Sequence, residues 1–80
     1  EIGLTKKTGF GINIADNGIY YLGIFKDDLP NGKGQLYNKN DKIIYDGDFI
    51  NGKKEGNGKY IFDNGQYYIG QYKDNLPNGK

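Results

Sequence analysis

The sequence predicts an all-β fold, a meander of short antiparallel strands built from one repeated unit. The first observation is the motif aromatic-x-Gly-x-aromatic, in which x is any residue. It starts at Tyr21, Tyr45 and Tyr68, at spacings of 24 and 23 residues. The second is that short runs rich in Ile, Tyr and Phe alternate with Asn, Asp and Gly, and no window has the periodicity of a helix. Because one hairpin buries too little surface alone, we expect stability to come from neighbouring units.

Glycines repeat in register with the aromatic motif. A Gly stands seven positions after the second aromatic of each motif. After the first two motifs another Gly follows two residues later, which makes a Gly-x-Gly pair, and a further such pair lies 23 residues before the first one. These glycines are Gly32, Gly56 and Gly79, their partners Gly34 and Gly58, and the N-terminal pair Gly9 and Gly11. Self-similarity at a fixed period is the signature of a repeat protein. We therefore interpret residues 1–80 as one array, with a partial unit at 9–20, full units at 21–44 and 45–67, and a partial unit at 68–80.

Turn-forming residues mark the ends of the expected strands. Asp16-Asn-Gly18 and Asp63-Asn-Gly65 indicate hairpin turns, since Asn and Gly accept a positive φ, and NKND at 38–41 adds one residue to the equivalent turn. The string LPNGK, at 29–33 and 76–80, predicts turns in which Pro30 and Pro77 lack an N–H at no cost. The expected strands are Phe10–Ile14, Ile19–Lys26, Gly34–Tyr37, Ile43–Phe49, Lys59–Phe62 and Gln66–Lys73.

Alternation along these strands assigns their two faces. Tyr21, Gly23 and Phe25 share one face, as do the corresponding residues of the other two motifs. The opposite face carries Leu22 and Ile24 in the first motif, whereas the second has acidic residues there. The aromatic face is the one common to every unit, and we expect it to pack. The central Gly leaves room for the flanking rings to meet rings from the next strand.

Composition excludes several classes of function. The 80 residues suffice for one small domain, and they contain no Cys, His or Ser, which excludes disulfides, thiolate or histidine metal sites and Ser–His or Cys–His nucleophiles. Eleven Lys and ten acidic residues give a net charge of +1, too balanced for a nucleic-acid partner. The pairs Asp27/Asp28 and Asp46/Asp48 lack the spacing of a calcium loop. We expect no catalytic residue, no metal and no cofactor.

The strings YLGIFKDDLPNGKG, YDGDFINGKKEGNGKYIFDNG and YYIGQYKDNLPNGK resemble MORN (membrane occupation and recognition nexus) repeats over about residues 9–80. Tyr72 departs from the usual Phe or Trp, and Asp41 stands where the other units have Gly. The resemblance implies an elongated, single-layer array of antiparallel hairpins with an aromatic-lined groove. It also implies a non-enzymatic intracellular scaffold, cytoplasmic or associated with the cytoskeleton or membranes, or an accessory domain of a larger enzyme.

The aromatic stripe is the expected partner-binding groove. Its candidate residues are Tyr21, Phe25, Leu36, Tyr45, Phe49, Tyr60, Tyr68 and Tyr72. Core packing alone also accounts for these rings. In a single-layer sheet, however, a ring can pack on one side and receive a partner on the other, and Tyr suits both tasks. The expected occupant is an amphipathic helix of a protein partner.

Three other interactions follow from the same sequence. Turn lysines Lys33, Lys53, Lys54 and Lys59 are candidates for facing an anionic membrane, although neighbouring Asp and Glu offset their charge. The string DNGQYY is similar to carbohydrate-binding hairpin repeats, but those repeats rely on Trp, which is absent. Exposed strand edges at the ends of the array predict self-association.

Overall fold

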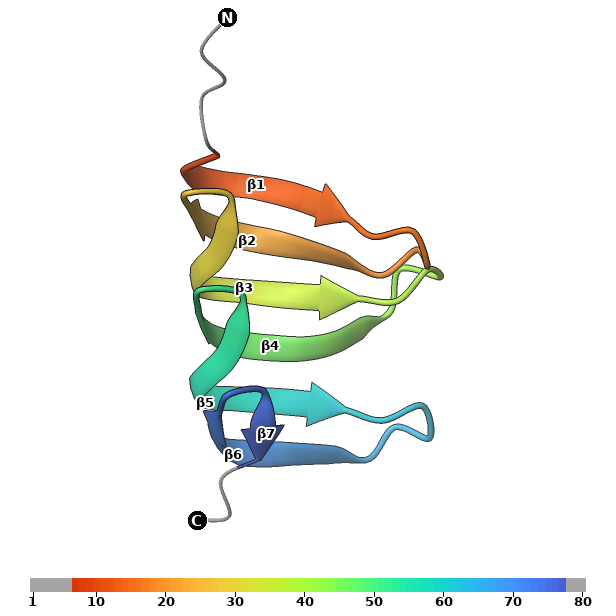
Figure 1. Ribbon diagram of the computed structural model, residues 1–80. Coiled ribbons are helices and arrows are strands. Elements are labelled where there is room, and N and C mark those ends of the chain that lie inside the picture. The colour runs from red at the N-terminus through yellow and green to blue at the C-terminus, as the bar shows by residue number, and fades with distance from the viewer. Residues whose placement is uncertain (1–6, 78–80) are drawn as a thin grey trace, which may run out of the picture.

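The computed structural model describes residues 7–77, which form one seven-stranded antiparallel sheet in which each strand pairs with the next along the chain (Figure 1). Within these residues there is no helix. The strands are β1 (Gly9–Ile14), β2 (Tyr20–Lys26), β3 (Leu29–Tyr37), β4 (Ile43–Ile50), β5 (Lys53–Ile61), β6 (Tyr67–Lys73) and β7 (Leu76–Pro77). The molecule measures 48 × 28 × 17 Å, an elongated single layer. The predicted all-β hairpin array is therefore confirmed.

Three hairpins close through turns of only two residues, and here the sequence prediction was wrong. Asp27 and Asp28 have φ of 52° and 72°, and the turns Asn51–Gly52 and Asp74–Asn75 are likewise left-handed at both positions. Two successive positive φ values are those of a type I′ turn, whose twist matches that of paired strands. The return strand therefore starts immediately, so β3 and β5 begin at Leu29 and Lys53, before the predicted Gly34 and Lys59.

The same tight turns place both prolines in strands instead of turns. Pro30 lies in β3 opposite Phe25, and Pro77 lies in β7 opposite Tyr72. Pro77 lies in the last strand of the sheet and Pro30 lies next to the register shift between Gly23 and Phe25, and a missing N–H is tolerated at both kinds of place. β7 was not predicted, because LPNGK was interpreted as a turn; Gly79 and the rest of that string from residue 78 lie outside the described residues.

The hairpin tips fold over one margin of the sheet. β3 and β5 bend at Gly32 and Gly56, with φ of 122° and 72°, and Figure 1 shows the first part of each strand, together with β7, crossing in front of the sheet. We call residues 26–31, 50–55 and 73–77 the flaps. Each flap bonds to the chain segment before it through one N–H donated to a carbonyl: Asp28 to Lys7 at 2.9 Å, Gly52 to Pro30 at 2.8 Å, and Asn75 to Lys54 at 3.1 Å. The flaps thus add a second ladder between units.

The loops at the opposite margin repeat one conformation. In each, the fourth residue donates its N–H to the carbonyl of the first, and these fourth residues are Gly18, Asp41 and Gly65. Asp41 adopts φ of 67° in place of glycine. The extra residue of the first full unit is not in this loop as predicted. It is accommodated in β4, where Tyr37 pairs with Ile43 and Leu36 with Tyr45, so that Ile44 bulges out of the ladder.

A row of glycines crosses six strands. The cross-strand partners run in sequence from one strand to the next through Gly11, Gly23, Gly34, Gly47, Gly58 and Gly70. A Cβ on Gly34 or Gly58 would lie closer than 3.0 Å to the ring of Tyr21 or Tyr45 respectively. Gly34 and Gly58 therefore make room for the ring of a tyrosine on the neighbouring strand, and the predicted ring contacts between strands are present as well, between Tyr21 and Phe49 and between Tyr45 and Tyr72.

Each of these tyrosines also caps an irregularity in the ladder. The β2–β3 register skips Ile24 and the β4–β5 register skips Asp48. The hydroxyl of Tyr21 donates to the Ile24 carbonyl at 2.7 Å, and that of Tyr45 donates to the Asp48 carbonyl at 3.2 Å. The tyrosine hydroxyl thus bonds to a backbone carbonyl at the point where the ladder with the next strand is interrupted.

The core is a zigzag of aromatic rings that joins the units. Tyr45 meets Phe49 of its own unit and Tyr72 of the next unit, both at 5.2 Å between ring centroids and 84° between ring planes. Tyr21 contacts Phe25 and Phe49 in the same edge-to-face manner. This geometry suits the quadrupoles of aromatic rings. The contact between units is therefore the hydrophobic core itself, as expected of a repeat array.

The buried phenols make stability sensitive to alkaline pH. Burial raises the pKa of Tyr45 from 10.0 to about 12, and burial also raises the pKa values of Tyr21 and Tyr72. Above pH 10 the unfolded chain loses phenolic protons that the folded chain still holds. We therefore expect the melting temperature to be constant up to about pH 10 and to fall progressively towards pH 12. Circular dichroism measures the melting temperature, and tyrosinate absorbance measures the ionisation of the phenols. A melting temperature unchanged across this interval would contradict the buried environment of these hydroxyls.

Candidate partner-binding groove

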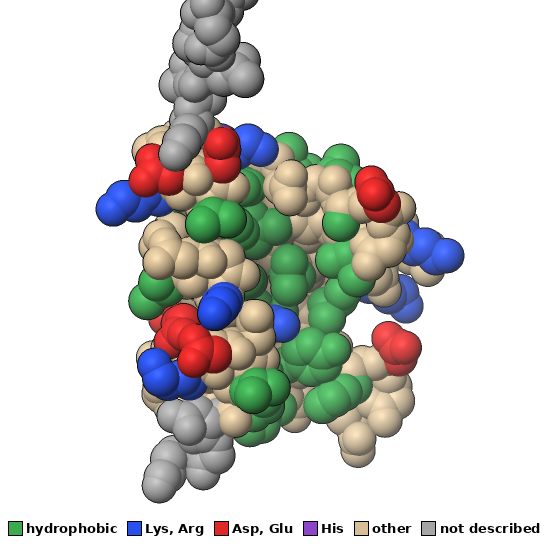
Figure 2. All heavy atoms as spheres, viewed as in Figure 1, with side chains coloured by type: hydrophobic (Ala, Val, Ile, Leu, Met, Phe, Trp, Pro, Cys, Tyr) green, Lys and Arg blue, Asp and Glu red, His purple; other side chains and the backbone are tan. Residues whose placement is uncertain are grey.

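A groove runs along the face that carries the rings, between the flaps on one margin and the loops 15–19, 38–42 and 62–66 on the other. Figure 2 shows this face: hydrophobic side chains gather along its middle, and most of the acidic and basic side chains lie towards its margins. Tyr20 on the loop margin is fixed by a hydroxyl bond to Asp41 at 2.8 Å and by stacking on Tyr37 at 5.0 Å. The groove thus has an apolar floor held by two hydrogen-bonded walls.

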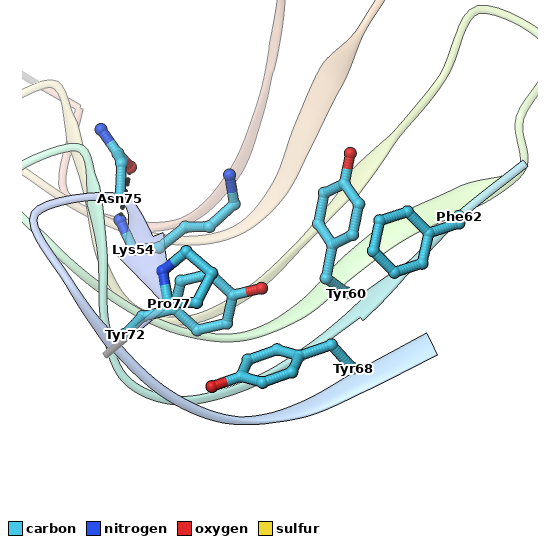
Figure 3. Close-up of a pocket in the computed structure, with 7 residues that line it drawn as sticks. All are labelled: Lys54, Tyr60, Phe62, Tyr68, Tyr72, Asn75 and Pro77. Carbon is cyan, nitrogen blue, oxygen red and sulfur yellow. Dashed lines mark hydrogen bonds between the residues drawn. The ribbon is translucent and has the colours of Figure 1, made fainter. Parts of the chain in front are cut away.

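The groove contains two hollows that share two lining residues. The first, about 330 Å³, is lined by Tyr21, Leu36 and Phe49 among others. The second, about 290 Å³, is lined by Lys54, Tyr60, Phe62, Tyr68, Tyr72, Asn75 and Pro77, and Figure 3 shows its tyrosines around the space with Lys54 along one side. Lys54 and Asn75 line both hollows, so they lie between them.

The eight residues predicted for the groove divide into two groups. Five are core residues, buried to 0–5% exposure: Tyr21, Phe25, Tyr45, Phe49 and Tyr72. Three are half-buried and pack against that core with one side still open: Leu36, Tyr60 and Tyr68. The first group supports the floor, and the second group forms its partly open surface. One stripe of residues thus forms both the buried core and the partly open floor above it.

The four predicted membrane-facing lysines do not form one ridge. Lys33 lies on the opposite face of the sheet, where it pairs with Asp48 at 2.8 Å. Lys59 lies on that face too, 4.6 Å from the ring of Tyr67. Lys53 projects at the flap margin towards Asp74, at 4.0 Å. Their charges are therefore spread over separate surfaces.

Lys54 belongs to the groove instead. It is half-buried, and its ammonium lies 5.3 Å from the centroid of Tyr45 and 5.8 Å from that of Tyr60. Burial lowers the pKa of this ammonium below its ordinary value. An alignment of the units would have separated Lys54 from the other three lysines, because Lys54 stands at the position that Pro30 and Pro77 occupy in their units.

A family model for the MORN repeat matches residues 21–42, 45–67 and 68–80, more than half of the chain. The chain belongs to the MORN repeat family. No curated protein matches it at a significant level. The MORN repeats and the open sheet of hairpins together make the chain a repeat-protein scaffold, in which each of the three matched repeats contributes aromatic residues to one stripe.

The structure shows how this MORN array extends beyond the matched segments. β1 precedes them, yet its Gly11 continues the glycine row opposite Gly23. The departures at Tyr72 and Asp41 are accommodated, since Tyr72 is 5% exposed in the core and Asp41 completes its loop. No three carboxylates within residues 7–77 form a group that could hold a metal ion. That part of the chain also has no helix able to cross a membrane.

Proposed function

We propose that this MORN array is a non-enzymatic binding scaffold whose groove receives an amphipathic helix of a protein partner. The observation that carries the proposal is the open apolar floor formed by Leu36, Tyr60 and Tyr68 on a rigid aromatic core. Half-exposed aromatic and aliphatic side chains in a groove between walls match the mode in which a helix inserts apolar residues spaced three or four apart. Such rings supply contact area at a small entropic cost on binding.

We favour a protein partner in the groove over recruitment by a membrane as the function of the array. Recruitment through turn lysines depends on several cations facing one anionic surface. Of the four candidates, Lys33 is paired with Asp48 and Lys54 lies over the groove rings. The groove, in contrast, presents three half-buried apolar side chains that all pack against one aromatic core.

The test uses two neighbouring residues of β3 that face opposite ways. Leu36 lines the groove, whereas Gln35 lies on the other face opposite Asp46. Peptides of about 20 residues, long enough for five helical turns, are selected for binding from an amphipathic-helix library. We expect Leu36→Lys to weaken binding at least about ten-fold, because it places a charge on the apolar floor, and Gln35→Lys to leave it unchanged.

Two measurements accompany the titration. Circular dichroism establishes that both variants fold, and Leu36→Ala replaces Leu36→Lys if the lysine variant does not. Amide shifts of the labelled domain then locate each peptide. A selection that yields no groove binder, or binders that respond equally to changes at Leu36 and Gln35, would count against the proposal.

A further inference from the structure

The ammonium of Lys54 is a cation that the fold of the array does not require. Pro30 occupies the equivalent flap position, and the carbonyls of both residues accept an N–H from the following flap. The backbone N–H of Lys54 donates to Asn75 Oδ1 at 2.8 Å, which explains why proline is replaced there. That bond needs only a backbone N–H, so any residue other than proline would make it.

The surroundings of Lys54 leave its charge unneutralised within residues 7–77. No carboxylate of these residues lies within ion-pair distance of its ammonium. The two acidic residues of the neighbouring flap segments have other partners: the Asp74 carboxylate pairs with Lys53, and the Glu55 carboxylate accepts the Asp74 N–H at 2.9 Å. Lys7, at the equivalent position two units earlier, donates its ammonium to the Ile12 carbonyl at 2.8 Å. The Lys54 ammonium has rings beneath it and the open groove beside it (Figure 3).

We infer that the helix received by the groove carries a single Asp or Glu on its apolar face, and that this carboxylate pairs with Lys54. The inference rests on the proposed function and specifies its partner. Apolar residues on either side of the carboxylate would enter the two hollows that meet at Lys54. A charge pair shielded from water is stronger than one at the surface, and a partly desolvated cation without a partner favours an acidic ligand.

The experiment varies one central position on the apolar face of the peptide library among Asp, Glu, Asn, Gln, Lys and Leu. Selection is run against the natural domain, Lys54→Met and the matched control Lys53→Met. Met retains the apolar stem over the rings and the backbone N–H that bonds Asn75. Lys53 is the adjacent residue of the same flap but points towards Asp74. We expect Asp and Glu to be enriched by the natural domain and by Lys53→Met, but not by Lys54→Met.

A double-mutant cycle then measures the pair itself. Changing the selected Glu of the peptide to Gln should weaken binding to the natural domain about ten-fold, and binding to Lys54→Met less than about two-fold. The Lys54 pKa, followed by nuclear magnetic resonance, should rise on binding the Glu peptide and not the Gln peptide, because a nearby carboxylate stabilises the charged amine.

The outcomes distinguish a failure of this inference from a failure of the proposed function on which it rests. Peptides that occupy the groove without preferring Asp or Glu, or a Glu→Gln effect that is equal on Lys54→Met, would overturn the carboxylate partner and leave groove binding intact. A failure of every selection to yield groove binders would overturn both.

Discussion

Replacing Gly58 with alanine is expected to be among the most damaging single-methyl changes in the chain. A Cβ at this position would lie closer than 3.0 Å to the hydroxyl and ring carbons of Tyr45. Those atoms are the end of a side chain that is itself 0% exposed and packed against Phe49 and Tyr72. The ring has no free space to move into, so we expect the free energy of unfolding to fall by about 3 kcal/mol, at the upper end for overpacking.

Gly11→Ala is the matched control, because Gly11 belongs to the same glycine row but carries no tyrosine ring. The nearest atoms to its Cβ would be the flexible Lys7 Cδ at 3.2 Å and a Phe25 ring carbon at 3.4 Å. We expect a change within about 1 kcal/mol, since alanine also restricts the unfolded chain. Chemical denaturation of both variants gives the comparison. Equal losses at Gly58 and Gly11 would mean that a general cost of alanine in the row, not the ring of Tyr45, decides the effect.

Truncating Tyr45 to alanine is the second large effect, with an expected loss of about 3–5 kcal/mol. The ring is the central member of the aromatic zigzag, and its removal leaves a cavity between two units. It also removes the hydroxyl that satisfies the Asp48 carbonyl. In an array of this size such a loss approaches the whole stability of a small domain, so we expect partial unfolding at room temperature.

Two further variants separate the contributions of Tyr45. Tyr45→Phe retains the ring and loses the hydroxyl bond, for which we expect about 1 kcal/mol. Tyr67→Ala removes a ring that is 59% exposed on the opposite face, and we expect a loss below about 1 kcal/mol. Thermal melts followed by circular dichroism rank the three. A Tyr45→Ala domain as stable as Tyr67→Ala would show that the ring is not packed in solution.

The sequence predicted much of the structure because the units repeat. Three occurrences of one motif predicted the all-β class, the aromatic face and the equivalent positions of Tyr21, Tyr45 and Tyr68, since a feature kept at a fixed spacing takes the same place in each unit. Alternation along the strand then placed Leu22 and Ile24 on the opposite face. These are local properties of a strand, and local sequence is sufficient for them.

Predictions failed where a residue's conformation depended on its partners. LPNGK has the composition of a turn, yet Pro30 lies in a strand, because the two left-handed residues before it had already reversed the chain. Those residues are Asp27 and Asp28, which are weaker turn signals than Asn-Gly. The extra residue of the first full unit was likewise assigned to its loop, whereas the bulge at Ile44 accommodates it. Neither outcome is visible without the cross-strand register.

The sequence by itself determined the repeat, the fold class and the aromatic stripe, because periodic side chains on a pleated backbone can be assigned to faces without knowing their neighbours. Only the tertiary structure decided which of these rings are core and which are floor. It also decided that Lys54 belongs to the groove and Lys33 to the opposite face. The physical reason is the bend at Gly32 and Gly56, which folds each flap over the rings and brings Lys54 above Tyr45.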